Sequence, residues 1–215
     1  MWWTDLTRHA PVALGVLGGS YVLGCFNTAY YLVRTRTGKD IRELGTGTAG
    51  AKNVSRVLGR TGFLLTVGGD ILKGAIGCSV ALALTGEDLM GLVAIMGVVA
   101  GHVWPIQLGF RGGKGVAASL GGLLFYSWQL TLCFCILYGL TIALTKKSTI
   151  GGLLSYALLP AAAYFLHQDA AHIWGISALA GLVILTHHRN ITDEIHQLLP
   201  RRPDSSGPDS SSLKS

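Results

Sequence analysis

The stretch VAASLGGLLFYSWQLTLCFCILYGLTIALT, residues 116–145, contains no charged side chain in 30 positions. As one straight helix it would be about 45 Å long, whereas the hydrocarbon core of a bilayer is about 30 Å thick. Arg111 and Lys114 precede the stretch, and Lys146 and Lys147 follow it. Basic residues favour one side of a membrane, so with both pairs on that side the stretch must cross an even number of times.

We therefore predict a break near Ser127–Gln129, which divides the stretch into a short helix and a full one. The other apolar runs are Pro11–Val33, Phe63–Leu84, Leu89–Phe110, Ile150–Leu166 and Ala170–Thr186. Together they predict an all-α integral membrane protein with about seven transmembrane helices, some short or broken, and with glycine-rich cytoplasmic loops. We expect residues 1–200 to form this single transmembrane domain and the polar residues 201–215 to form a disordered tail.

The charge pattern supports a membrane protein and predicts its orientation. Only 13% of the residues are charged, about half the share typical of soluble domains. Segment 34–60 contains seven basic residues, namely Arg34, Arg36, Lys39, Arg42, Lys52, Arg56 and Arg60. The opposite face carries Glu87, Asp88 and Asp169, so we place the N-terminus outside and the C-terminus in the cytoplasm, with the protein in the plasma (inner) membrane. The basic residues lie next to apolar spans, so the net charge of +6 indicates phosphates or lipid head groups as partners, and no nucleic acid.

The cysteines offer no further chemistry. Cys25, Cys78, Cys133 and Cys135 lie inside apolar runs, without a CxxC pair or a polar Cys/His cluster. We interpret them as buried side chains, and we expect neither a disulfide framework nor a metal site.

Three polar segments between the spans carry the candidate chemistry. The first is DIRELGTGTAGAKNVSR, residues 40–56. Its glycines allow tight turns that present backbone N–H groups, and Arg42, Lys52 and Arg56 supply positive charge. Such a loop predicts an anion site. The alternative is a flexible basic loop that touches anionic lipid.

The second segment is GHVWPIQLGFRGGKG, residues 101–115. Gly112, Gly113 and Gly115 surround Lys114 and permit close approach of the backbone to a phosphate, just before an expected helix start. The GxxxxGK[ST] spacing of the nucleotide-binding P-loop is absent and no strand pattern precedes the segment, so nucleotide hydrolysis is disfavoured.

The third polar region consists of KSTIG, residues 147–151, and HHRN, residues 187–190. Hydroxyl, imidazole and amide groups at the ends of spans are suited to orient a nucleophile or a leaving group. The alternative for each histidine is an interfacial side chain with a local hydrogen bond.

Two charged residues lie inside an expected span. Asp70 and Lys73 are one helical turn apart, and charges within a bilayer usually face a partner or a polar cavity. We predict an internal ion pair that supports the loop, with direct substrate contact as the lesser alternative. His102 is expected to be a hydrogen-bonding packing residue.

Taken together, these segments resemble the bacterial acyl-phosphate:glycerol-3-phosphate acyltransferase family, small multispan enzymes that begin phosphatidic acid synthesis. The matching stretches are Gly19-Ser20, Asp40–Arg42, the glycine pattern to Asn53 and Arg56, Asp70 with Lys73-Gly74, Gly101-His102 with Pro105, Phe110–Ala117, and His187-x-x-Asn190-Ile191. Where the family reads SGNxGATN, this chain has Thr46-Gly-Thr48-Ala-Gly-Ala-Lys52-Asn53, and a family serine is Thr149, beside Ser148.

The resemblance implies transfer of a fatty acyl group from acyl phosphate to the 1-hydroxyl of glycerol 3-phosphate, giving lysophosphatidic acid and phosphate. It implies catalytic roles for Thr46, Thr149, His187 and Asn190. It implies substrate or phosphate binding by Asn53, Arg56, Gly112, Gly113, Lys114, Gly115 and Ser148. The implied partners are acyl phosphate, glycerol 3-phosphate and membrane lipids, without a cofactor or metal, and the protein is expected to be monomeric.

Three alternatives stay open at the level of sequence. The segment His188–Asp193 matches the HxxxxD pattern of acyltransferases that use acyl-CoA or acyl carrier protein, although the largely non-membrane domain of that class is missing. Asp70 and Lys73 would suit a small-anion transporter, but the basic loops lie on one side only. A catalytically weakened paralogue that binds a phosphate-bearing substrate or lipid is the third, because Thr46 and Thr48 replace family residues.

Overall fold

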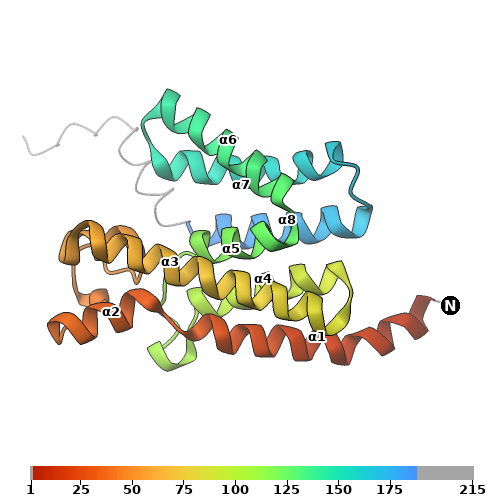
Figure 1. Ribbon diagram of the computed structural model, residues 1–215, viewed down its shortest axis with the longest axis horizontal. Helices are drawn as coiled ribbons and strands as arrows, with labels where there is room; N and C mark the ends of the chain where they lie inside the picture. The colour runs from red at the N-terminus through yellow and green to blue at the C-terminus, as the bar shows by residue number, and fades with distance from the viewer. Residues whose placement is uncertain (1, 188–215) are drawn as a thin grey trace, which may run out of the picture.

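The protein, seen here as a computed structural model, is described over residues 2–187, with side chains from residue 10 onward. Helices form most of this part of the chain (Figure 1). The α-helices are α1 Trp2–Cys25, α2 Thr28–Thr37, α3 Ala51–Thr85, α4 Asp88–Val103, α5 Val116–Tyr126, α6 Trp128–Thr145, α7 Ser148–Phe165 and α8 Ala170–Leu185. Two short 3-10 helices, η1 Ile41–Glu43 and η2 Ile106–Leu108, lie in the loops, and no strand occurs between residues 2 and 187.

The predicted break in the stretch 116–145 is confirmed at Ser127. This residue ends α5, and its hydroxyl accepts a hydrogen bond from the Leu130 N–H at 3.3 Å, which caps the start of α6. The two helices have 11 and 18 residues, so they are the expected short helix and full helix.

The remaining spans confirm an all-α, multi-pass membrane protein. Within the described residues, five helical segments are long and apolar enough to cross a membrane, and α5 and α8 are shorter apolar helices. Two features differ from the predicted runs. The first run is interrupted at Asn27, whose side chain caps α2 by accepting a hydrogen bond from the Tyr30 N–H at 3.0 Å. The helix α3 is 35 residues long and is kinked at Gly59, where φ is 66° and ψ is −159°.

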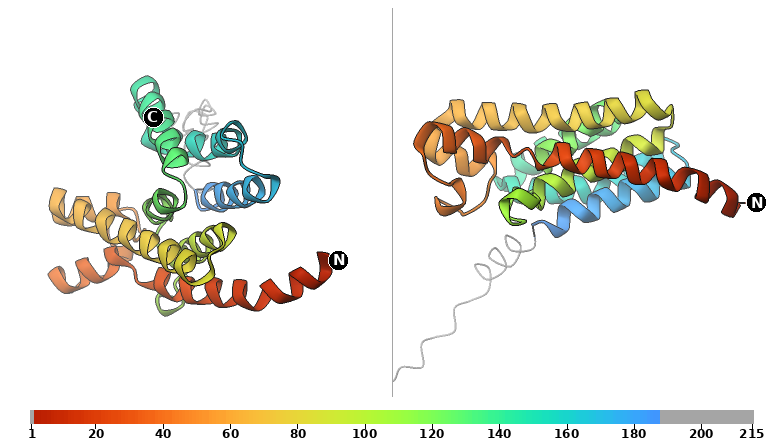
Figure 2. Two further views of the ribbon diagram at one scale, coloured as in Figure 1. Left: turned by 45° about the vertical axis from the view of Figure 1, so that its right-hand side comes forward. Right: turned by 90° about the horizontal axis from the view of Figure 1, so that it is seen from below.

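The helices form two groups, which meet where α8 packs on α4 and α6 packs on α5 (Figure 2). In the first group α1 packs on α4, and α3 packs on α4 and α5; in the second, α6, α7 and α8 pack in sequence. A Cβ on Gly24 would lie 2.2 Å from the Val98 carbonyl oxygen, and one on Gly74 would lie 1.8 Å from that of Ala118. Glycine is therefore needed at both contacts, as expected in a bilayer, where close backbone packing drives helix association.

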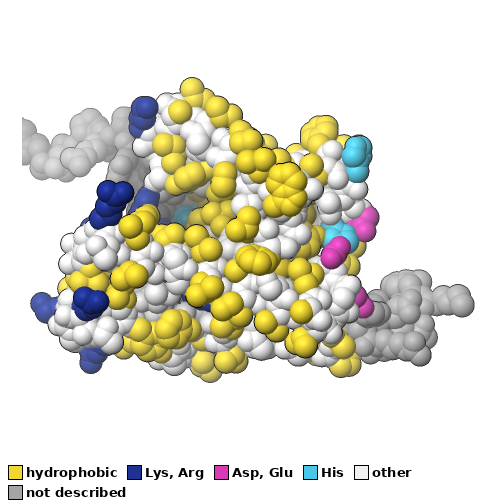
Figure 3. Space-filling view, in the orientation of Figure 1, with side chains coloured by type: hydrophobic (Ala, Val, Ile, Leu, Met, Phe, Trp, Pro, Cys, Tyr) yellow, Lys and Arg dark blue, Asp and Glu magenta, His cyan; other side chains and the backbone are white. Residues whose placement is uncertain are grey.

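Charges are separated along the molecule. Lys and Arg gather at one end of the face in Figure 3, and Asp and Glu gather at the other. The first end, which we call the basic end, holds segments 34–60, 104–115 and 146–149. Hydrogen bonds between Ala49 and Gly112 and between Lys52 and Ser148 join these segments. Polar segments far apart in the sequence thus meet at one end of the bundle.

Candidate active site

Asn53 shapes the first glycine-rich loop, residues 45–50. Its buried side-chain oxygen accepts the Thr46 N–H at 2.9 Å, and its amide nitrogen donates to the carbonyls of Leu44 and Thr48 at 2.8 and 2.9 Å. Gly45 has a φ of 55°, and a Cβ there would lie 2.2 Å from the Asn53 oxygen. The Asn53 side chain is engaged with the loop backbone, so its part in binding an anion is to hold the shape of the loop.

The apex of this loop presents two hydroxyl groups. Thr46 is exposed, and its Oγ1 lies 3.1 Å from Oγ1 of Thr48. Arg56 lies beside the loop, because a Cβ on Gly45 would be 3.6 Å from its Cδ. The structure thus brings the predicted residues Thr46 and Arg56 to the same loop.

The role of Arg42 in the structure differs from the predicted one, which was to add positive charge to the site. Its Nη2 lies 2.6 Å from Oδ2 of Asp40, and its Nη1 donates to the carbonyl of Leu108. The hydrogen bond from Arg42 lowers the pKa of the Asp40 carboxyl below its usual value. Arg42 is therefore a neutralised link between η1 and η2.

The second glycine-rich loop, residues 109–115, lies flat against the end of α4. The N–H groups of Gly112 and Gly113 donate to the carbonyls of Val103 and His102 at 3.0 and 3.1 Å. A Cβ on Gly112 would lie 2.0 Å from the His102 carbonyl oxygen. These glycines were expected to admit a phosphate to the backbone; instead, the space that their side chains would need is filled by α4.

A hydrogen bond joins the two loops to each other, and the end of α8 contacts the second loop. The Ala49 N–H donates to the Gly112 carbonyl at 3.3 Å. The Thr186 hydroxyl, at the end of α8, lies within donating distance of the Lys114 carbonyl, at 3.0 Å, and of the Val183 carbonyl in its own helix, at 2.7 Å. Nothing in the sequence marked Thr186 as part of the site, because its role depends on where α8 ends. Lys114 is thereby fixed at the point where three segments meet.

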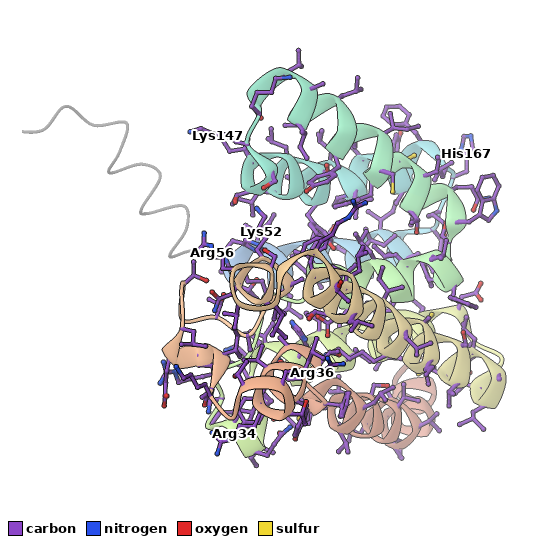
Figure 4. All side chains as sticks on the ribbon, turned by 60° about the vertical axis from the view of Figure 1, so that its left-hand side comes forward. Arg34, Arg36, Lys52, Arg56, Lys147 and His167 are labelled. Carbon is purple, nitrogen blue, oxygen red and sulfur yellow. The ribbon has the colours of Figure 1, made fainter. Side chains whose placement is uncertain are left out.

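The start of α7 meets the start of α3. Lys52, the second residue of α3, donates a hydrogen bond to the hydroxyl of Ser148, the first residue of α7, and Thr149 follows in the same turn. Figure 4 shows Lys52 and Arg56 on the side of α3 that faces α7 and Lys147, whereas Arg34 and Arg36 lie away from it on α2.

Three helices begin at the basic end without a side-chain cap. Gly50, Gly115 and Lys147 precede α3, α5 and α7, and none of them forms a side-chain capping hydrogen bond in the described structure. At the opposite end Ser127 and Asp169 cap α6 and α8, whereas Glu87 forms no side-chain capping hydrogen bond to α4 among the described residues. Helix starts carry partial positive charge and N–H donors, so the basic end is suited to hold anions.

His187 lies at this end as a neutral imidazole. It is buried, and its Nδ1 lies 2.8 Å from the Val183 carbonyl oxygen, which can only accept, so Nδ1 carries the proton. Burial lowers the pKa of His187 below its usual value, and the charges of Lys114 and Lys52 lower it further. Its Nε2 therefore has a lone pair with which to accept a proton or a hydrogen bond at neutral pH.

Comparison with known proteins accounts for this arrangement. The family model described as "Glycerol-3-phosphate acyltransferase" matches residues 14–197. The chain belongs to this family. A "Glycerol-3-phosphate acyltransferase 1" of Desulfitobacterium hafniense is 36% identical over 191 residues, covering 89% of this chain and 95% of the relative. A "Glycerol-3-phosphate acyltransferase" of Clostridioides difficile is 38% identical over 177 residues, covering 80% and 86%.

A solved structure supports the same conclusion. The crystal structure of PlsY (YgiH), an integral membrane glycerol 3-phosphate acyltransferase, in its glycerol 3-phosphate form has a TM-score of 0.79 and 25% identity. The match covers 89% of this chain and 96% of that one. The protein is thus an acyltransferase of the membrane. Asn190 and the alternative pattern His188–Asp193 lie outside the described residues.

The cause of the lowered pKa of His187 can be tested in this acyltransferase. In Lys52→Met one of the two lowering charges is lost, so the pKa of His187 should rise toward its ordinary value of about 6.5. Protonation would then begin at a higher pH than in the parent protein. NMR titration of His187 in detergent measures this change. As a control, Lys39→Met removes a lysine that does not contribute to the lowered pKa of His187 and should leave its titration unchanged. An unchanged pKa of His187 in Lys52→Met would contradict the role assigned to Lys52.

Proposed function

We propose that this protein transfers a fatty acyl group from acyl phosphate to the 1-hydroxyl of glycerol 3-phosphate, forming lysophosphatidic acid and inorganic phosphate. The observation that carries the proposal is the junction of two glycine-rich loops, Ala49 to Gly112, at the basic end of a multi-pass bundle. Both proposed substrates carry phosphate, and the relatives are named for the acceptor, glycerol 3-phosphate.

The chemistry requires mainly positioning. Acyl phosphate is an activated mixed anhydride: the acceptor hydroxyl oxygen attacks the acyl carbon, an ester bond forms, and the bond from acyl carbon to phosphate oxygen breaks. The leaving phosphate takes the electron pair and receives the hydroxyl proton. Fixed charge and orientation supply most of the acceleration for such a reaction.

Each candidate residue has a role in this scheme. Arg56 and Lys114 bind substrate phosphate, and Nε2 of neutral His187 accepts a hydrogen bond from the acceptor hydroxyl and orients it. Catalytic roles at the reacting groups are proposed for Thr46, Thr149 and Asn190, and Ser148 is proposed to bind substrate phosphate. The loop glycines Gly112, Gly113 and Gly115 set the position of Lys114.

The proposed activity is tested with purified protein, acyl phosphate and glycerol 3-phosphate. We expect inorganic phosphate and lysophosphatidic acid in equal amounts, and no product when acyl-CoA replaces acyl phosphate. Transfer from acyl-CoA with an inert acyl phosphate would contradict the proposal and favour the HxxxxD class. In that case Asp193→Ala should abolish activity, whereas we expect it to leave activity nearly intact.

The phosphate-binding roles predict a defined loss. A charge-assisted hydrogen bond contributes about 1.5–3 kcal/mol, so Lys114→Ala and Arg56→Ala should each lower kcat/KM by roughly 10- to 150-fold. Steady-state kinetics against both substrates measures the loss. Arg36→Ala removes a basic residue of α2 that lies away from the site in Figure 4 and should change little. Parent kinetics in Lys114→Ala would show that the second loop is only structural.

The orientation is part of the proposal. The basic end faces the cytoplasm, with the N-terminus outside, because basic residues are retained on the cytoplasmic side of the plasma (inner) membrane. With the four native cysteines replaced, Thr48→Cys should react with an impermeant thiol reagent only from inside and Glu87→Cys only from outside. Labelling of position 48 from outside would contradict the proposed orientation.

We also propose that the protein acts as a monomer. A single-protomer mass in active detergent solution would support this, and an obligate dimer would contradict it.

A further inference from the structure

A buried polar cluster lies directly beneath the junction of the glycine-rich loops. It consists of Asp70 and Lys73 of α3 and His102 of α4, each no more than 4% exposed. Nζ of Lys73 lies 3.0 Å from Oδ1 of Asp70 and 2.7 Å from Nδ1 of His102. The predicted ion pair is thus confirmed, and His102 is the hydrogen-bonding packing residue that was expected.

The contacts of Lys73 fix the proton of His102. Lys73 also donates to the carbonyls of Gly24 and Phe26, at 3.3 and 2.9 Å, and its pairing with Asp70 makes it an ammonium. Nδ1 of His102 lies 2.7 Å from Nζ of Lys73 and 3.5 Å from Oδ1 of Asp70, so the contact with Lys73 is the closer one. An ammonium has donors and no lone pair, so in this contact Nδ1 of His102 accepts. The neutral ring then carries its proton on Nε2.

That Nε2–H faces the site. A Cβ on Gly113 would lie 2.1 Å from Nε2 of His102 and 2.8 Å from the Ala49 carbonyl oxygen, so the nitrogen lies where the two loops meet. Among residues 10–187, no side chain or backbone group accepts a hydrogen bond from it. With no acceptor among these described residues, the donor is available to a ligand that binds at the loop junction.

We propose that His102 is a further substrate-binding residue, whose Nε2–H donates to a phosphate oxygen of the substrate at the loop junction. Asp70 and Lys73 are its positioning residues, because they hold the tautomer that makes Nε2 the donor. Gly113 is required for the same contact, since any side chain there would occupy the position next to this nitrogen. The inference rests on the proposed function, which supplies the phosphate.

The first test uses the parent protein and needs no enzymatic turnover. In protein labelled with ¹⁵N at histidine, His102 should show the Nε2–H tautomer, and its Nε2 resonance should shift on addition of glycerol 3-phosphate or inorganic phosphate. His102→Phe identifies the resonance. An Nδ1–H tautomer, or a resonance unmoved by saturating glycerol 3-phosphate in active protein, would overturn the inference. A shift with phosphate in protein that lacks transfer activity would support it while refuting the proposed function.

The second test separates binding from folding. His102→Phe keeps a planar ring without a donor and should lower kcat/KM by roughly 10- to 150-fold, mostly through a higher KM for the substrate whose phosphate is bound. His102→Gln retains an N–H donor at similar reach and should recover kcat/KM to within about tenfold of the parent value. His172→Phe makes the same change at the opposite end and should be silent. Parent KM values for both substrates in His102→Phe would contradict the proposal, and its loss of folding would leave the Gln variant and the NMR result to decide.

Discussion

The buried ammonium of Lys73 is the contact on which the rest of the structure depends. It holds three helices at once, because its partners are Asp70 in its own helix α3, the carbonyls of Gly24 and Phe26 at the end of α1, and His102 of α4. An unpaired charge in this position costs several kcal/mol, so all of these partners must keep their places. The carbonyls of Gly24 and Phe26 belong to the interruption between α1 and α2, so Lys73 supplies donors where the helical hydrogen bonds of the first span stop.

This constraint reaches the loops through α4. His102 contacts Lys73 with its ring, and with its backbone carbonyl it accepts the Gly113 N–H. Gly112 in turn accepts from Ala49, and Lys114 accepts from Thr186. Both glycine-rich loops and the end of α8 are therefore positioned by the same buried charge. A mobile basic loop on lipid, the alternative reading of segment 40–56, does not fit a loop whose buried Asn53 side chain forms hydrogen bonds to its backbone.

Sequence alone predicted the features that are set by long-range physical rules. The break at Ser127 followed from bilayer thickness and the placement of four basic residues, and the Asp70–Lys73 pair followed from the cost of charge in a membrane. The break at Asn27 was missed, because it lies in an uninterrupted apolar run and is stabilised by Lys73, 46 positions further on. Arg42 was misassigned for a similar reason. Asp40 neutralises it, and its hydrogen bond to the Leu108 carbonyl depends on how η1 and η2 meet. Glycine-rich loops signal close backbone contact, but the sequence does not say whether the contact is with a ligand or with another helix.

The position of the site at the helix ends follows from the substrates that such an enzyme must combine. A fatty acyl chain is stable in the bilayer and a sugar-alcohol phosphate is stable in water, so the reacting groups can meet only at the interface. There the described bundle presents three helix starts without a side-chain cap, which supply N–H donors and partial positive charge. The acyl phosphate proposed as donor is already activated, so catalysis of the proposed reaction depends mainly on holding two anions in the correct relative position. The buried Asp70–Lys73 pair lies beneath the two glycine-rich loops and helps to fix their positions, so the apolar helices themselves build the basic end.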